Sequence, residues 1–236
     1  MRKLFMAEME AVGDQLVEMA TLVNRAMKQA RVAMESQDLG LAETVITQDA
    51  RIDYLQNALD ERTIELLLLQ NPVATDLRLL IAALRVSSSM ERMGDLARHT
   101  AALTRLRHPH PLVPAPSQPE MQEMAELVVQ IGEHLQLLMT DYDLTHGRAI
   151  VKLNNDVDIL HSKVLTSVTD GTWDIDATQA QDLTLLVMRL ERFGDHAVSI
   201  SRKIAYLVTG EWEPPVVIQR TSPTRLSATV PQPGGF

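Results

Sequence analysis

Two short segments, one hundred residues apart, carry the side chains best suited to chemistry. Residues 90–99 are MERMGDLARH and residues 190–199 are LERFGDHAVS, so the pattern Glu-Arg-x-Gly-Asp occurs twice. On a helix, residues four apart are neighbours, and two carboxylates in that relation repel each other by roughly a few tenths of a kcal/mol. An interior glycine costs a helix roughly 1 kcal/mol relative to alanine. Because both unfavourable features occur together in both segments, they indicate a functional or packing requirement.

A second set of acids precedes each motif. The segment DLGLAETVITQDARIDYL, which begins at residue 38, aligns with DLTHGRAIVKLNNDVDIL, which begins at residue 143. This alignment pairs Asp49 with Asn154 and Asp53 with Asp158. If these segments form helices antiparallel to the motif helices, an Asp-x3-Asp pair faces a Glu-x3-Asp pair in the first copy. Four carboxylates then share one surface patch.

Such a patch repels itself unless cations join it, and oxygen-only ligands suit hard cations such as Mg²⁺, Mn²⁺ or iron. The chain lacks both cysteine and the Glu-x2-His pair of buried di-iron bundles, which points away from a buried redox centre. His99, one turn beyond Asp95, is a candidate nitrogen ligand. The alternative is a solvated face on which the acids form ion pairs with Arg51, Arg92, Arg98 or Arg192.

Composition and charge limit the class of protein. Hydrophobic residues make up 45% of the 236 residues and aromatic residues only 3%, with 12 Met, which favours helix packing. A net charge of −9 argues against a nucleic-acid binder. The absence of cysteine excludes a disulfide framework, a thiolate metal site and a cysteine nucleophile. Acidic residues interrupt any signal-like segment near residue 1, and no apolar run approaches about 18 residues, so we expect a cytoplasmic protein.

The helical pattern is interrupted in few places. Five prolines within residues 107–120 predict an extended linker, and the Pro-rich segment from residue 213 predicts a flexible tail. Elsewhere the sequence predicts helices over about 4–36, 40–70, 73–107, 120–142, 146–169 and 177–209. Asp38 and Asp143 are predicted to start the second and fifth helices. The predicted parts are a three-helix repeat (1–107), a linker (108–119), a three-helix repeat (120–212) and a tail (213–236).

The two repeats predict an internal duplication, and hence an all-α fold of two tandem three-helix bundles. Apolar stripes place the acids on the flank of each helix, and the two motif glycines are predicted to admit a neighbouring helix or cluster. The stripes comprise Leu79, Ala83, Val86, Met90, Met93 and Ala97; Leu183, Leu186, Leu190, Phe193 and Ala197; and Leu41, Val45, Ile52, Leu55 and Leu59.

The doubled motif, each copy preceded by its acidic middle helix, resembles the PhoU family, the accessory regulators of high-affinity phosphate uptake. The resemblance covers about residues 4–210. It implies a non-enzymatic negative regulator, peripheral to the membrane, that links the ATPase of a phosphate ABC transporter to a sensor histidine kinase. It also implies a homodimer that does not bind nucleic acid.

The resemblance further implies that the carboxylates bind Mg²⁺, Mn²⁺, iron or Zn²⁺ in metal clusters. Carried over by motif, the ligands are Asp49, Asp53, Glu91 and Asp95 in the first repeat and Asp158, Glu191 and Asp195 in the second. Asn154 departs from the acidic pattern, so we expect the second site to bind a hard cation more weakly. Asp156 or the Asn154 carbonyl is a candidate substitute.

Two other functions stay open from the sequence. One is an accessory regulator of another phosphate or metal-ion transporter. The other is a carboxylate-bridged metal enzyme, although the chain has no Gly-rich phosphate loop and no Ser/His/Asp grouping with a nucleophile signature. An enzyme would turn over a phosphoester with added Mn²⁺ or Mg²⁺, whereas a regulator would only bind its partner.

Overall fold

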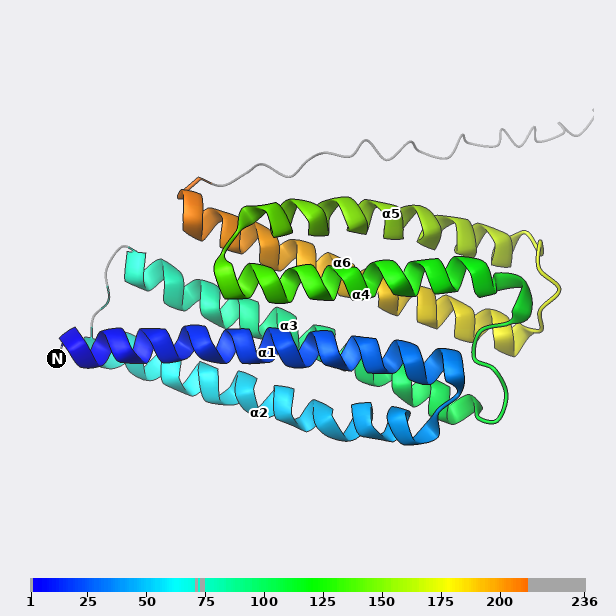
Figure 1. Cartoon of the computed structure of the whole chain (residues 1–236), viewed down its shortest axis with the longest axis horizontal. Helices are drawn as coiled ribbons and strands as arrows, with labels where there is room; N and C mark the ends of the chain where they lie inside the picture. Colours follow the sequence, from blue (N-terminus) through cyan, green and yellow to red (C-terminus); the bar gives the residue numbers. More distant parts are fainter. Residues whose placement is uncertain (1, 71, 73–74, 212–236) are drawn as a thin grey trace, which may run out of the picture.

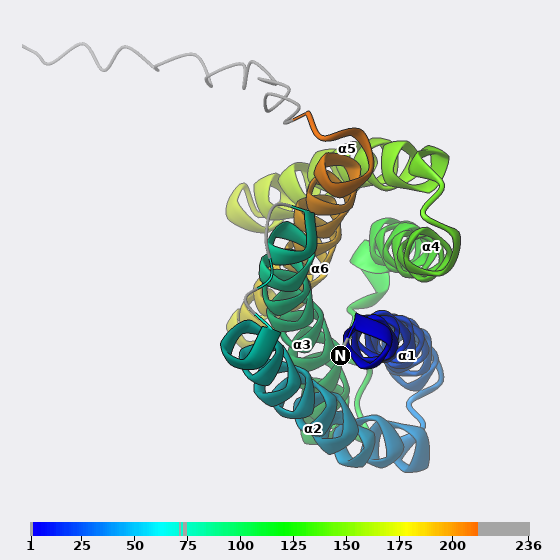
Figure 2. The same ribbon diagram turned by 90° about the vertical axis from the view of Figure 1, so that its left-hand side faces the viewer.

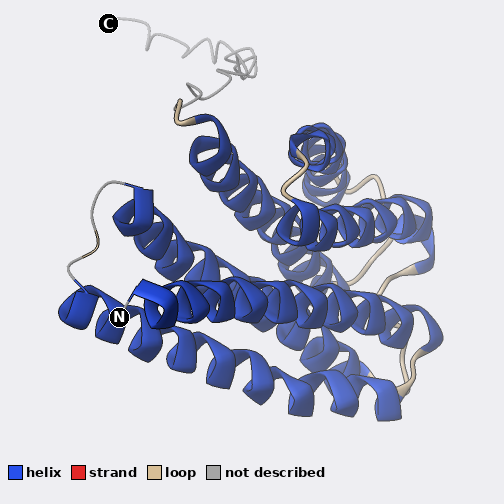
Figure 3. Ribbon diagram, turned by 60° about the vertical axis from the view of Figure 1, so that its left-hand side comes forward, coloured by secondary structure: helices blue, strands red, loops and turns tan. Residues whose placement is uncertain are grey.

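The computed structural model describes residues 2–70, 72 and 75–211. Within these residues the chain forms long α-helices and one short 3-10 helix, η1, and no strand (Figures 1 and 3). The elements are α1 (Arg2–Ser36), α2 (Leu39–Gln70), α3 (Thr75–Arg107), η1 (Ala115–Ser117), α4 (Gln118–Asp141), α5 (Leu144–Thr169) and α6 (Ala177–Thr209). The predicted helices are confirmed, with ends that differ by one or two residues.

The helices form two bundles that lie against each other. Helices α1, α2 and α3 contact one another, as do α4, α5 and α6. Between the bundles, α3 packs on α6 and α1 packs on α4 (Figure 2). The predicted all-α fold of two tandem three-helix bundles is therefore confirmed.

Helices α3 and α6 run antiparallel and are tied together by polar contacts. Arg107 Nη2 donates to Asp182 Oδ1 at 2.9 Å, and Arg189 Nη1 donates to the His99 carbonyl at 2.9 Å. Moving toward the start of α3 thus corresponds to moving toward the end of α6. In the same register, the Gly94-Asp95 motif of α3 and the Gly194-Asp195 motif of α6 lie at the same height along the α3–α6 contact.

The core consists of Leu, Met, Val, Ala and Ile, as the composition predicts. One residue of the predicted α3 stripe is wrong, since Leu79 is 36% exposed while its neighbour Leu80 is buried. Helix α3 contacts α1, α2 and α6, so its buried face is wider than one stripe. Leu79 instead lies near the start of α1, in a hollow that Met6 and Met9 also line.

Two aspartates start helices as predicted. Asp38 Oδ1 accepts from the backbone NH of Leu41 at 2.9 Å. Asp143 Oδ1 accepts from the NH of Thr145 at 2.8 Å. These bonds satisfy donors that the first turn of a helix leaves without a partner.

The connection between the bundles is only partly extended. Residues 108–114 form turns and bends, Leu112 is buried, and η1 leads directly into α4. The prediction of an extended linker is wrong at Ala115–Ser117, because proline is tolerated in the first turn of a helix. The division at residues 107, 119 and 212 stays a prediction, and the predicted tail lies outside the described residues.

None of the described helices combines the length and the apolar character that a membrane span requires.

Candidate functional site

The first cluster forms where α2 crosses Gly94 on α3. Asp49 is only 6% exposed, and its Oδ1 atom would lie 3.0 Å from a Cβ placed on Gly94. That Cβ would also lie 2.9 Å from Ile52 Cδ1. The predicted role of this glycine, close approach of a neighbouring helix, is confirmed.

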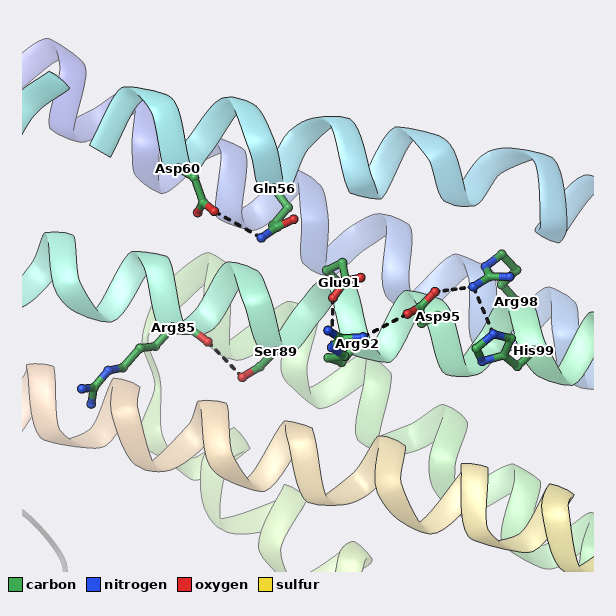
Figure 4. A network of polar contacts seen from close by, with 9 residues as sticks. All are labelled: Gln56, Asp60, Arg85, Ser89, Glu91, Arg92, Asp95, Arg98 and His99. Carbon is green, nitrogen blue, oxygen red and sulfur yellow. Dashed lines mark hydrogen bonds and ion pairs between the residues drawn. The ribbon is translucent and has the colours of Figure 1, made fainter. Parts of the chain in front are cut away.

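An arginine neutralises part of this cluster. Arg98 Nε donates to Asp49 Oδ2 at 2.6 Å. Figure 4 shows the second bond, in which Arg98 Nη2 donates to Asp95 Oδ1 at 2.5 Å. Arg92 lies 3.4 Å from Glu91 Oε2 and 3.5 Å from Asp95 Oδ2. The ion pairs of the alternative interpretation are thus present for Asp49, Glu91 and Asp95, but Asp49 is buried and does not lie on a solvated face.

The carboxylates of the first cluster still repel one another, although Arg98 and Arg92 offset part of this repulsion. Burial, and then the nearby charge of Asp53, raise the pKa of Asp49. Burial also raises the pKa of Glu91, and Asp95 and Asp53 raise it further. A further positive charge near these carboxylates would therefore stabilise their ionised forms.

His99 is turned toward the arginine of the cluster. Its Nε2 atom lies 3.0 Å from Arg98 Nη2 (Figure 4). Burial and then the charge of Arg98 lower the pKa of His99. The side chain is thus placed as a neutral neighbour of Arg98, and the structure gives no support to its role as a ligand beside Asp95.

The second cluster brings three carboxylates together from α5 and α6. One oxygen each from Asp158, Glu191 and Asp195 lie within 4.8 Å of one another. This trio is the one group of three or more His, Cys, Asp or Glu side chains with metal-binding spacing in the part of the chain that the structure describes. The donor set consists of oxygen alone, which suits a hard cation.

Asn154 orients a member of this trio. Its side chain is 5% exposed, and its Nδ2 atom donates to Asp195 Oδ1 at 3.2 Å. Its Oδ1 atom lies against Gly194, where an added Cβ would overlap it, and this oxygen accepts no hydrogen bond. The carbonyl therefore faces the helix backbone and does not replace the missing carboxylate. Asp156, the other candidate substitute, is exposed and outside the trio.

The second cluster lacks the arginine of the first. In the register that aligns the two motifs, Val198 occupies the position of Arg98. Burial, and then the charge of Asp195, raise the pKa of Glu191, while His161 and Arg192 oppose that rise. Sequence reasoning missed His161, although its place three residues after Asp158 on one helix was a usable signal.

The two clusters are therefore less alike than their motifs. In the first, Arg98 lies between Asp49 and Asp95, and Asp53 is exposed. In the second, the three oxygens converge. The sequence favours stronger cation binding at the first cluster, because Asn154 replaces a carboxylate in the second. The convergence of three oxygens favours stronger binding at the second cluster. Cation binding at either cluster stays a prediction.

Comparisons with family models, named relatives and solved structures all point to the same protein family. The model of the PhoU domain matches the chain twice, over residues 16–104 and 121–204. The boundaries of these matches fall within the two three-helix bundles.

Named relatives and solved structures agree with this match. The chain is 34% identical to the phosphate-specific transport system accessory protein PhoU homolog 2 of Mycobacterium tuberculosis, over 89% of this chain and 99% of that protein. It is 32% identical to PhoU homolog 1 of Mycobacterium leprae, over 90% and 96%. The crystal structure of PhoU from Pseudomonas aeruginosa superposes with a TM-score of 0.79 at 25% identity, covering 88% of this chain and all of that one. The chain belongs to the PhoU domain family.

Proposed function

We propose that this accessory protein of phosphate transport is a negative regulator of phosphate uptake and of phosphate-starvation signalling. In this proposal it links the ATPase subunit of a phosphate ABC transporter to a sensor histidine kinase. The observation that carries the proposal is the doubled PhoU domain, shared over most of the chain with relatives named as accessory proteins of phosphate-specific transport.

The proposal includes the setting in which the protein works. It is a cytoplasmic homodimer that reaches the membrane through its partners, and it is not an enzyme. The names of the relatives describe accessory proteins, which supports a binding role. The purified protein should therefore leave phosphoesters intact when Mn²⁺ or Mg²⁺ is added. Turnover that disappears with the carboxylates would favour the metal-enzyme alternative.

Deletion of the gene tests the regulatory role. In phosphate-rich medium, loss of the protein should derepress phosphate-starvation genes, because the restraint on the kinase is removed. The measurement is the output of a reporter for those genes. Since a paralogue can mask the effect, the strain must lack every paralogue, and unchanged reporter output in that strain would contradict the proposal.

A second part of the proposal concerns cations. Asp158, Glu191 and Asp195 hold Mg²⁺, Mn²⁺, iron or Zn²⁺, which offsets the mutual repulsion of three carboxylates. Convergence of their oxygens within 4.8 Å supports this role. The carboxylates of the first cluster form a second, weaker site, because a cation there must compete with Arg98 for Asp49 and Asp95.

Titration of metal-stripped protein with Mn²⁺ and Mg²⁺ tests the order of the two sites. We expect two classes of site, with the tighter class lost in the double variant E191Q/D195N. The matched variant E91Q/D95N should remove only the weaker class. Arg98→Met should strengthen binding at the first cluster by about tenfold or more, because it removes a competing charge. One class of site that survives E191Q/D195N would contradict the assignment.

A further inference from the structure

A cavity of about 270 Å³ lies between the start of α3 and the end of α6. Both ends are at the same extremity of the molecule, and the two helices lie side by side there (Figures 1 and 2). Leu77, Ile81 and Ala82 supply apolar lining, and Leu77 and Ile81 are 40% and 39% exposed. A hollow of this size accommodates one large apolar side chain.

Three cations surround the apolar lining: Arg78 and Arg85 of α3 and Lys203 of α6. None of them forms an ion pair within the described residues, although the protein carries a net charge of −9. In the part of the chain that the structure describes, Lys203 Nζ donates to Ser199 alone, to its carbonyl at 3.2 Å and its hydroxyl at 2.6 Å. The charged side chains that line this cavity are therefore all positive, and among the described residues no carboxylate forms an ion pair with them.

At the opposite end of the α3–α6 contact, an arginine is paired with a buried aspartate of the facing helix. In the register that aligns the two motifs, Asp182 of α6 occupies the position of Ala82 in α3. Asp182 is 4% exposed and accepts two hydrogen bonds from Arg107 of the facing helix. At the cavity end, Ala82 and Leu207 stand in place of Asp182 and Arg107. The cations Arg78, Arg85 and Lys203 occupy positions that are Thr178, Leu185 and Leu103 at the opposite end. The position that carries an internal acid at one end of the contact is thus apolar at the other.

We propose that this cavity docks an acidic segment of a partner protein, which inserts one apolar side chain and sets its carboxylates against Arg78, Arg85 and Lys203. A concave site of single-side-chain size suits a peptide anchor, whereas a flat membrane surface has nothing to insert into it. This inference rests on the proposed regulatory role in one respect, namely that the segment bound in the cavity belongs to a partner protein.

The salt dependence of binding has a diagnostic sign. The protein as a whole is negative, so its overall field repels an acidic peptide, and added salt would relieve that repulsion. Attraction to the three local cations has the opposite sign, and added salt weakens it. Weaker binding at higher ionic strength would therefore locate the contact at a basic site.

Binding of a synthetic peptide to the full chain tests the proposal. The probe is a fluorescent helical peptide with one Leu and with Glu four residues to either side of it, and affinity is measured by fluorescence anisotropy. We expect binding that weakens with salt, and loss of binding when Leu is replaced by Ser or the Glu residues by Lys. Arg85→Ala should weaken binding by about tenfold, and Ile81→Glu should abolish it. Arg85→Lys should keep most of the affinity.

Arg25→Ala is the matched control, because Arg25 is exposed on α1 and does not line the cavity. Unchanged affinity in Arg85→Ala and Ile81→Glu would overturn the proposal, and so would equal loss in Arg25→Ala. Binding seen only after removal of residues 212–236 would identify the chain's own segment as the occupant. A change in oligomeric state in Ile81→Glu would identify a second copy. Because the assay uses no cells, its failure is distinguishable from failure of the reporter experiment.

Discussion

At the scale of single residues, the two copies of the motif have different surroundings. Glu91 and Asp95 share their surface with Arg98, whereas Glu191 and Asp195 have Val198 at the matching position. The seven candidate ligands followed from the doubled motif and the family resemblance, and their role as ligands stays a prediction. The sequence could not identify which cation meets them, because that depends on how Arg98 is oriented between α2 and α3.

Glu191 should make metal-free stability depend on pH. Its pKa is raised by burial and then by Asp195, so its ionisation opposes folding. This penalty is absent below the ordinary glutamate pKa of 4.5, grows as pH rises above it, and is complete above the raised pKa of the folded state. Glu191→Gln should therefore stabilise the metal-free protein at neutral pH, with an advantage that shrinks on acidification, as measured by thermal unfolding.

Addition of Mn²⁺ supplies the control for this prediction. Cation binding stabilises a folded protein by mass action, so Mn²⁺ should raise the melting temperature of the original chain more than that of Glu191→Gln. An advantage of the Gln variant that is the same at every pH would show that ionisation of Glu191 is not its cause.

At the scale of elements, the helices and their pairing within each bundle were predictable from the sequence. Apolar periodicity sets the faces, aspartates set two helix starts, and the glycines mark where α2 and α5 approach closely. Leu79 was misplaced because a single stripe does not describe a helix with three neighbours. Contact with a third neighbour is set by tertiary packing, which periodicity along one helix does not encode.

The two motif glycines should tolerate alanine to different degrees. At Gly194 an added Cβ would overlap Asn154 Oδ1, whereas at Gly94 it would meet Ile52 Cδ1 at 2.9 Å and Asp49 Oδ1 at 3.0 Å. Overpacking of this kind costs about 1–3 kcal/mol. We expect Gly194→Ala to lower the free energy of unfolding within that range and Gly94→Ala to lower it by less, as measured by denaturant unfolding.

Gly13→Ala is the matched control, because nothing lies within 4 Å of a Cβ at that position in α1. It should stabilise the protein by about 0.5–1 kcal/mol through helix propensity alone. Asn154→Ala should recover part of the loss in Gly194→Ala, since it removes the overlapping oxygen. Equal stabilisation in all three glycine variants would show that helix propensity, and not close approach, governs these positions.

At the scale of the whole molecule, the docking of the two bundles determines where the candidate sites lie. The antiparallel α3–α6 contact sets both Gly-Asp motifs level with each other and creates the cationic cavity at one end. Sequence patterns within each repeat do not fix this contact, because each repeat buries its own stripes whichever way the bundles meet. The cavity and its three cations therefore became visible only in the assembled structure.

If both proposals hold, the cavity and the second cluster should make separable contributions to regulation. In a strain that lacks every paralogue, the chain with Arg85→Ala should restore repression poorly, because a tenfold weaker contact leaves about a tenth of the docked complex when the partner is below its Kd. The measurement is the output of a phosphate-starvation reporter at matched protein abundance. Arg25→Ala should repress fully, and Arg85→Ala should still bind Mn²⁺ like the original chain. Full repression by Arg85→Ala, in a protein that has lost peptide binding, would show that the cavity has no part in regulation.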